Sequence, residues 1–207
     1  MNRSDPNGCT PTCSDGKGGE YVRSRESVLA RKILRLFDMK RYEQGLKLAC
    51  LLFSTDSISR AFEFIGTKYR DDDGKIVRDC SLFVFGVYSE KCYLGGGDRS
   101  GYPYNRRAYN QYNFTRESDA WNSVSRVALQ AGDLIFYKDN GCNCTEATDQ
   151  IHHVAIYLGY GLMIDSTTVK DANDQYIING VTIRSINTTL TLSGKEMSIK
   201  AYMHFCG

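Results

Sequence analysis

A chain of 207 residues is long enough for one sizeable domain, or for a catalytic domain preceded by a helical extension. Its 26 Lys and Arg residues nearly balance 24 Asp and Glu residues, which excludes the strongly basic composition of a dedicated nucleic-acid binder. No apolar stretch approaches the roughly 18 to 20 residues that cross a bilayer, and the polar N-terminus lacks the apolar core of a signal peptide.

The N-terminal quarter of the chain is predicted to be a leader followed by helices. Residues 1–23 are rich in Gly, Pro and small polar residues, so we expect a flexible leader. After Ser24, apolar residues recur at the 3.6-residue period of an amphipathic helix, whose basic opposite face we interpret as solvated. Two further apolar segments predict two more helices before residue 80. We therefore expect a single domain over residues 24–207, with residues 24–56 as its helical extension.

Cys80 lies where polar sequence turns into a nearly continuous apolar run that ends at Tyr88. Such a run is expected to form a buried helix with Cys80 in its first turn. Helix N-termini stabilise a thiolate through their unpaired N–H groups and their dipole. Residue type alone also allows the alternative that Cys80 is a small core residue.

The second half of the chain is predicted to be a sheet, because its apolar residues alternate from Val127 onward. The turn signal Gly159-Tyr160-Gly161 predicts one hairpin, and Asn179-Gly180 predicts another between short strands at 176–178 and 181–186. A last strand over 198–205 closes the sheet. Helices followed by antiparallel strands indicate an α+β fold. The Tyr-rich segment 93–121 is expected to be a loop-rich wall over a cleft, or a surface loop without a ligand.

A cysteine nucleophile needs a base and a third group that orients the base. The histidines are His152, His153 and His204, and adjacent strand residues point to opposite faces, so only one of the first two can face Cys80. Asp165 follows the hairpin turn and can neighbour His153 across the strands. A carboxylate there would hold the imidazole in one tautomer and favour its cation, which in turn favours a thiolate.

The sequence supports a metal site less well than it supports a cysteine nucleophile. The three acids at residues 71–73 lack the alternating ligands and terminal Glu of a calcium loop. Zinc could take four thiolates, but one pair lies in the leader and the other is too tightly spaced, the residues being Cys9, Cys13, Cys142 and Cys144. We therefore predict no metal, no cofactor and, for an exported protein, disulfides.

The cysteine count predicts at least one further free thiol. Eight cysteines less the nucleophile leave seven, an odd number. Cys50 lies on the apolar face of a predicted helix, so we expect it to be buried.

Three blocks follow one another in the chain: Asp79-Cys80-Ser81, Leu129-x-x-Gly132-Asp133-Leu134-x-Phe136, and His153-Val154-Ala155-Ile156-Tyr157-Leu158-Gly159-x-Gly161-x-Met163-Ile164-Asp165. In this order they resemble the NlpC-type cysteine peptidases, papain-like enzymes that cut bacterial cell-wall peptides. The resemblance covers about residues 58–186. It implies a papain-like fold in which N-terminal helices, including the nucleophile helix, pack on a C-terminal antiparallel sheet.

The resemblance also implies roles for individual residues. Cys80 would be the nucleophile, His153 the general base and Asp165 the third polar residue. Tyr69, Asp79 and Ser81 match family residues that hold the free amine of the peptidoglycan stem's first residue, and residues 106–111 match a segment of Arg and Gln. The implied reaction is hydrolysis of the bond between D-glutamate and a diamino acid.

Some residues depart from the family pattern and weaken the substrate assignment more than the reaction class. Leu82 replaces a glycine, residues 70–72 replace Trp-Gly-Gly, and Asp165 stands where histidine is most frequent. Alternative functions are another thiol-dependent amidase or acyltransferase on the same scaffold, and a non-catalytic cell-wall-binding module. The expected partner is a peptidoglycan stem peptide, in the extracellular space, cell wall or periplasm. Neither the delivery route nor an inhibitor or immunity protein is evident from the sequence.

Overall fold

The computed structural model describes residues 23–53, 56–88, 107–142, 150–186, 190–192 and 195–206. The helices are α1 (Arg23–Asp38), α2 (Tyr42–Leu52), α3 (Asp56–Glu63), α4 (Cys80–Tyr88), α5 (Ala108–Glu117) and the 3-10 helix η2 (Arg126–Ala128). The strands are β1 (Trp121–Val124), β2 (Leu134–Asp139), β3 (Ile151–Gly159), β4 (Leu162–Lys170), β5 (Tyr176–Ser185), β6 (Leu190–Leu192) and β7 (Lys195–Phe205). The expected leader lies outside the described residues apart from Arg23, where α1 begins.

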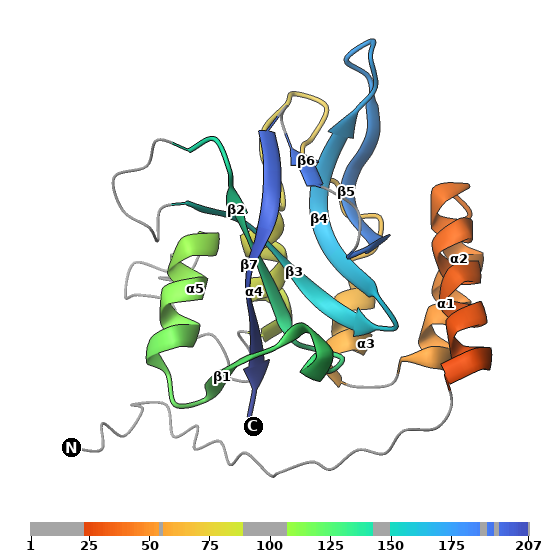
Figure 1. Ribbon diagram of the computed structural model, residues 1–207. Coiled ribbons are helices and arrows are strands. Elements are labelled where there is room, and N and C mark those ends of the chain that lie inside the picture. Colours follow the sequence, from red (N-terminus) through yellow and green to blue (C-terminus); the bar gives the residue numbers. More distant parts are fainter. Residues whose placement is uncertain are drawn as a thin grey trace.

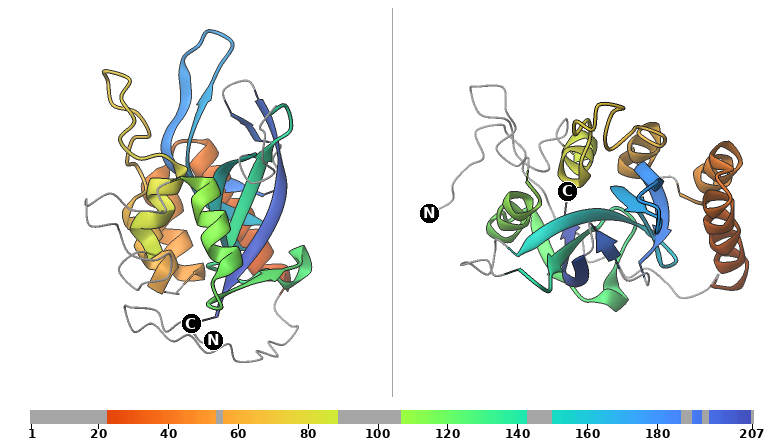
Figure 2. Two further views of the ribbon diagram at one scale, coloured as in Figure 1. Left: turned by 90° about the vertical axis from the view of Figure 1, so that its left-hand side faces the viewer. Right: turned by 90° about the horizontal axis from the view of Figure 1, so that it is seen from above.

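The described strands form one antiparallel sheet in the order β1-β7-β2-β3-β4-β5, with β6 paired to β7. Figures 1 and 2 show the sheet strongly curved, with α4 and α5 on one side of it and α1 and α2 beyond β5. The predicted α+β fold, with helices before an antiparallel sheet, is confirmed. So are the three helices predicted ahead of Cys80.

The main core lies between the sheet and the helices. Helix α4 is almost entirely apolar, and its Phe83 and Val84 are fully buried. Strand β3 alternates as a two-sided strand should, sending Val154, Ile156 and Leu158 into this core. A smaller cluster on the opposite face of the sheet contains Ile135, Tyr137, Ala155, Met163, Ile186 and Met197. The sheet is therefore buried on both faces over its central strands.

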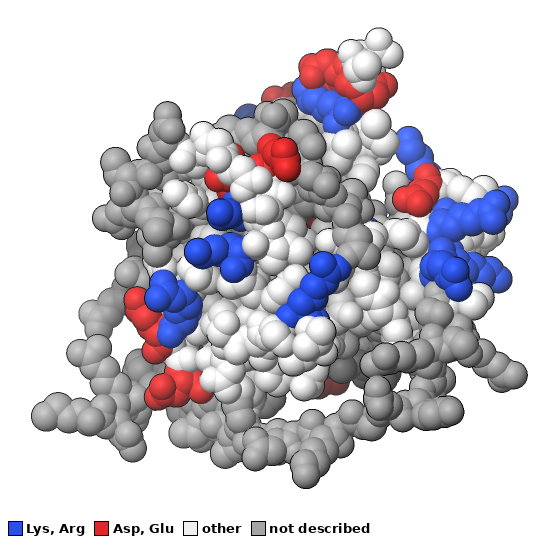
Figure 3. All heavy atoms as spheres, viewed as in Figure 1, with Lys and Arg blue, Asp and Glu red and all other residues white. Residues whose placement is uncertain are grey.

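Helix α1 shares the main core with the sheet. Ala30, Ile33 and Phe37 recur on one face of α1 and are buried with Val181 and Ile183 of β5. Its opposite face carries exposed basic residues, and Lys and Arg side chains gather over α1 and α2 in Figure 3. The helical extension thus packs against β5, the strand at this edge of the sheet.

The hairpin predicted at Gly159-Tyr160-Gly161 is confirmed. All three residues have positive φ, with values of +108°, +52° and +77°. Glycine adopts such angles without a steric penalty, which is why two glycines flank Tyr160. The turn joins β3 to β4.

The hairpin predicted at Asn179-Gly180 is wrong. Both residues lie inside the continuous strand β5, and the turn that joins β4 to β5 is at residues 171–175, organised by the Asp171 carboxylate. Gly180 serves a different purpose, because Thr67 crosses the strand here and Val181 N–H donates to the Thr67 carbonyl over 3.0 Å. An added Cβ on Gly180 would lie 2.1 Å from that oxygen.

The loop-rich wall predicted over residues 93–121 is wrong for its described part. Residues 108–117 form α5, and Trp121 begins β1, while 89–106 lie outside the described residues. The buried residues of α5 are Ala108, Gln111, Tyr112 and Thr115, which follow a helical period. Most residues on this face are polar or aromatic, so the helical period does not appear in the spacing of aliphatic residues.

Among the described residues, no helix combines the length and apolarity that a bilayer-spanning helix needs.

Candidate active site

Cys80 is the first residue of α4, and Asp79 caps that helix. Oδ1 of Asp79 accepts hydrogen bonds from the backbone N–H of Leu82 and from the hydroxyl of Ser81, both over 2.8 Å. An Asp at this position satisfies one of the N–H groups that a helix start leaves unpaired. The thiol of Cys80 therefore lies at the positive end of the helix dipole, with 7% of the residue exposed.

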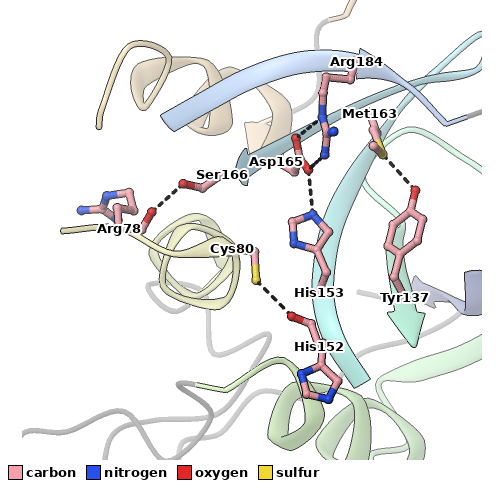
Figure 4. Close-up of polar contacts among 9 residues, drawn as sticks. All are labelled: Arg78, Cys80, Tyr137, His152, His153, Met163, Asp165, Ser166 and Arg184. Atoms are coloured by element: carbon pink, nitrogen blue, oxygen red, sulfur yellow. Dashed lines mark hydrogen bonds and ion pairs between the residues drawn. The ribbon is translucent and has the colours of Figure 1, made fainter. Parts of the chain in front are cut away.

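The His153 imidazole lies where β3 and β4 separate. The pairing of these strands ends at Ile156 with Ile164, and continuing that register would set Ala155 opposite Asp165. His153 therefore meets Asp165 diagonally, with Nε2 of the ring 2.7 Å from Oδ2 of the carboxylate. Figure 4 shows the ring between Asp165 and the start of α4. The expected contact between the two side chains is confirmed, although they are not a directly opposed pair.

The tautomer of His153 follows from this contact. Since a carboxylate accepts hydrogen bonds, Nε2 carries the proton shared with Asp165 and leaves Nδ1 for the thiol of Cys80. The Cys80 sulfur itself lies 3.9 Å from the backbone carbonyl of His152. His153 is buried and His152 is exposed, as strand alternation predicted.

His153 and Asp165 form a hydrogen-bonded pair, called the dyad below, and neighbouring groups set the charge of each member. Burial opposes protonation of His153, but the charge of Cys80 and hydrogen bonds to Asp165 and Cys80 outweigh burial and raise the pKa of His153 to about 9. Burial also opposes ionisation of Asp165, yet Arg184 and His153 lower the pKa of Asp165 to about 2. An imidazolium and a carboxylate therefore face each other at neutral pH, beside the thiol.

Two further residues fix the dyad and were not anticipated from the sequence. Arg184 of β5 donates from Nε to Oδ1 of Asp165 over 3.1 Å and from Nη2 to Oδ2. Tyr137 of β2 lies against the His153 ring, with centroids 5.7 Å apart, and its hydroxyl donates to the Met163 sulfur over 3.0 Å. The sequence signal for Arg184 was a basic residue within the alternating run 181–186. Its contact with Asp165 could not be predicted from that signal, because the contact depends on the β4 to β5 register.

The residues predicted to bind substrate lie beside the thiol. Burial, followed by the nearby charges of Cys80 and Asp79, raises the pKa of Tyr69 to about 12. Ser81 is 3% exposed and donates to Asp79. The fold therefore brings Tyr69, Asp79 and Ser81 together at the start of α4. Of the Arg and Gln segment, Arg106 lies outside the described residues, whereas Gln111 donates to the Ser81 carbonyl over 2.7 Å.

The third histidine lies elsewhere. His204 of β7 bonds through Nδ1 to Oδ1 of Asp133 over 2.7 Å, in the turn that precedes β2. That pair ties the end of β7 to the start of β2 and does not reach Cys80. His153 is thus the imidazole that the fold sets against the thiol.

The cysteines of the described residues are divided between thiols and disulfides, whereas Cys9, Cys13, Cys92 and Cys144, with the zinc alternative that included three of them, lie outside the described residues. Cys80 and Cys50 are free, while Cys142 and Cys206 are disulfide-bonded. Cys50 is exposed, so its predicted burial is wrong; it lies on the outer face of α2, whereas Ala49 faces the core. Within the described part of the chain, ligand atoms of Asp139, Cys142 and His152 lie within 4.8 Å of one another. A sulfur held in a disulfide is not the thiolate that zinc binds, so this group does not form a zinc site in the oxidised protein.

Comparison with known families adds to this geometry. The NlpC/P60 family matches residues 60–190, which include α4, β3 and β4. The chain belongs to the NlpC/P60 family. No curated protein sequence matches the chain.

Several solved structures of NlpC/P60 proteins also match part of this chain. An NlpC/P60 family protein from Bacillus cereus is 23% identical over 75% of this chain and 41% of its own length, with a TM-score of 0.47. RipD from Mycobacterium tuberculosis, described as a non-catalytic NlpC/p60 domain protein adapted to peptidoglycan binding, is 17% identical over 72% of this chain and 92% of its own, with a TM-score of 0.42. The NlpC/p60 domain of the peptidoglycan hydrolase SagA is 22% identical over 70% of this chain and 96% of its own, with a TM-score of 0.37. This chain therefore spans less than half the length of the Bacillus cereus protein.

Proposed function

We propose that this NlpC/P60 family chain is a cysteine peptidase that hydrolyses peptidoglycan stem peptides at the bond between D-glutamate and a diamino acid. The observation that carries the proposal is the buried His153 imidazole, which lies between the thiol of Cys80 and the carboxylate of Asp165. A nucleophile, a base and an orienting group in that order are what thiol-dependent acyl transfer needs.

In the first half-reaction, the Cys80 thiolate attacks the carbonyl carbon of the scissile amide. Electrons move onto the carbonyl oxygen, which backbone N–H groups at the start of α4 stabilise. The tetrahedral intermediate then collapses, the C–N bond breaks, and the His153 imidazolium gives its proton to the leaving amine. A thioester on Cys80 remains.

In the second half-reaction, water replaces the amine. Neutral His153 takes a proton from the water as its oxygen attacks the thioester carbon. The C–S bond breaks, the stem fragment leaves as a carboxylic acid, and the thiolate with its imidazolium is restored. Asp165 holds Nε2 of His153 through both steps, so that Nδ1 stays directed at the reacting atoms.

The preference for a stem peptide rests on the residues around the thiol. Tyr69, Asp79 and Ser81 present a phenol, a carboxylate and a hydroxyl beside Cys80. An acidic and hydroxylic set is suited to a cationic amine one residue from the bond that is cut. The site of action would then be the cell wall.

The test is digestion of purified peptidoglycan and of defined muropeptides, read by mass spectrometry of the fragments. Wild type is expected to release fragments that end in D-glutamate, and Cys80→Ala to lose about a thousandfold or more of the turnover. Cys50→Ala is the matched control, because Cys50 is the other free thiol of the described residues and is exposed. It is expected to keep full activity.

Other outcomes would replace the proposal. Undiminished release by Cys80→Ala would show that the nucleophile is wrong. Cleavage of other amides in place of stem peptides would identify a different amidase or an acyltransferase. Binding of peptidoglycan without any hydrolysis, unaffected by alkylation of Cys80, would identify a binding module.

A further inference from the structure

Asp165 is contacted from both sides along the sheet. His153 approaches it from β3, and Arg184 approaches it from β5. The β4 to β5 register pairs Asp165 with Thr182 and Arg184 with Met163, so the guanidinium also reaches the carboxylate diagonally. Figure 4 shows Arg184, Asp165 and His153 in one line.

We infer that Arg184 is a positioning residue that holds the Asp165 carboxylate in line with His153 and cancels its charge, so that a net neutral pair orients the base. The inference rests on the proposed function, in which His153 is the base and later the acid. It adds a residue from the last third of the chain to the residues that support catalysis.

The first argument for the inference is geometric. Arg184 binds both oxygens of Asp165, one from Nε and one from Nη2. A planar guanidinium that donates two hydrogen bonds, called the fork below, fixes the plane of a carboxylate as well as its position. Oδ2 is shared between Arg184 and His153, so any rotation of the carboxylate would break the contact with the imidazole.

The second argument is electrostatic. Asp165 is fully buried, and a buried carboxylate without a partner is strongly disfavoured. The charged or titratable groups that face the dyad are Cys80 from α4, Arg184 from β5 and Tyr137 from β2, with Tyr202 of β7 and Arg126 of η2 acting on Tyr137. In that set, Arg184 is the cation in direct contact with Asp165.

Cancelling the charge of Asp165 has a consequence for the acid step. A bare carboxylate would stabilise the imidazolium further and make it a poorer proton donor to the leaving amine. The guanidinium limits that effect while leaving the hydrogen bond in place. Arg184 therefore lets an aspartate orient the imidazole with little net charge on the orienting pair.

The experiment uses the full chain with Arg184→Gln and Arg184→Lys, and Arg35→Gln as the control that removes one exposed arginine of α1. The rate at which iodoacetamide alkylates Cys80 is measured from pH 4 to 11 by mass spectrometry of the peptide that contains Cys80. This rate reports the reactivity of the Cys80 sulfur beside His153, so its step at high pH, the upper step, follows loss of the imidazolium proton; the measurement needs no substrate. Turnover of muropeptides and thermal unfolding are measured on the same samples.

Arg184→Gln is expected to move the upper step of the alkylation profile to higher pH by about one unit, since a charge close to a titrating group shifts its pKa by about one to three units. Turnover should fall about 10- to 100-fold with little change in KM, because a displaced base costs rate and not binding. Arg184→Lys should keep the upper step near its wild-type pH but lose turnover, because a point charge replaces the fork. Arg35→Gln should match wild type in every readout.

An unchanged upper step in folded Arg184→Gln would overturn the inference. So would loss of activity in strict proportion to the loss of folded protein, which is what a purely structural arginine would give. If Arg184→Gln does not fold, Arg184→Lys decides the question, because full turnover in that variant would contradict a role for the fork. A wild-type alkylation profile that shows the upper step, without cleavage of muropeptides, would count against the proposed substrate and leave the inference standing.

Discussion

The side chain of Gln111 in α5 holds the backbone carbonyl of Ser81 in α4. Its Nε2 donates over 2.7 Å, and both the amide and its partner are buried. The carbonyl belongs to the residue that follows Cys80, so this bond links the position of the thiol to a helix that is distant in sequence.

Replacing Gln111 by Leu should therefore disturb both stability and catalysis. The Ser81 carbonyl would lose one buried hydrogen bond, which costs about 0.5 to 1.5 kcal/mol of unfolding free energy. Turnover should fall more than binding, because the thiol loses a positional restraint. Denaturant unfolding and steady-state kinetics measure the two effects. Gln44→Leu, on the exposed face of α2, is the matched control and should change neither.

The proposed peptidase activity should be lost at alkaline pH. The pKa of His153 is raised from its ordinary value of 6.5 to about 9, so the protonated form is favoured in the folded protein and is lost only as the pH rises through about 9. The value of kcat/KM should stay level from neutral pH upward and fall above that point. Initial rates on a defined muropeptide across pH 5 to 11 measure it.

Asp165→Asn provides the control for that profile. An amide cannot supply the negative charge, so the pKa of His153 should fall and the alkaline limb should move to lower pH, opposite to the shift expected for Arg184→Gln. Turnover should drop by about a hundredfold or more, because an amide permits the wrong tautomer. An alkaline limb that does not move in Asp165→Asn would show that another group sets the protonation of His153.

Gly180→Ala should be strongly destabilising. Its φ is +145°, and the new Cβ would lie 2.1 Å from the backbone oxygen of Thr67, which cannot rotate away. The cost should exceed the roughly 1 to 2 kcal/mol that positive φ alone imposes on an L-residue. Gly74→Ala isolates that smaller term, since Gly74 has φ of +79° and no atoms near its added Cβ. Equal losses for the two variants, by thermal or denaturant unfolding, would contradict the close approach of Thr67.

Ile33→Ala tests whether α1 belongs to the same cooperative unit as the sheet. Ile33 is completely buried against the main core, so the substitution should cost about 2 to 5 kcal/mol and shift a single unfolding transition. Val28→Ala, on the same helix but 57% exposed, should stay within about 0.5 kcal/mol of wild type. Two separate transitions, with only the weaker one shifted by Ile33→Ala, would show instead that the helical extension unfolds by itself.

The sequence alone determined most of the secondary structure and the residue types of the candidate site. Apolar periods and turn residues act over a few positions, so they located α1, α4, the strands β2 to β4 and the turn at 159–161. The order of Cys80, His153 and Asp165 also singled out the groups that now lie together. Local signals failed where a distant segment determined the role of a residue. Gly180 is one case: a glycine is needed there because the backbone of Thr67 passes too close for a Cβ, and not because the chain turns.

Only the tertiary structure decided what surrounds those residues. His153 meets Asp165 because β3 and β4 separate beyond Ile156 and Ile164, and Arg184 reaches Asp165 because of the β4 to β5 register. Such diagonal contacts depend on strand pairing over many residues, and no local pattern encodes them. The physical reason is that periodicity specifies which face a side chain takes, whereas packing of the whole sheet specifies which side chain it meets there.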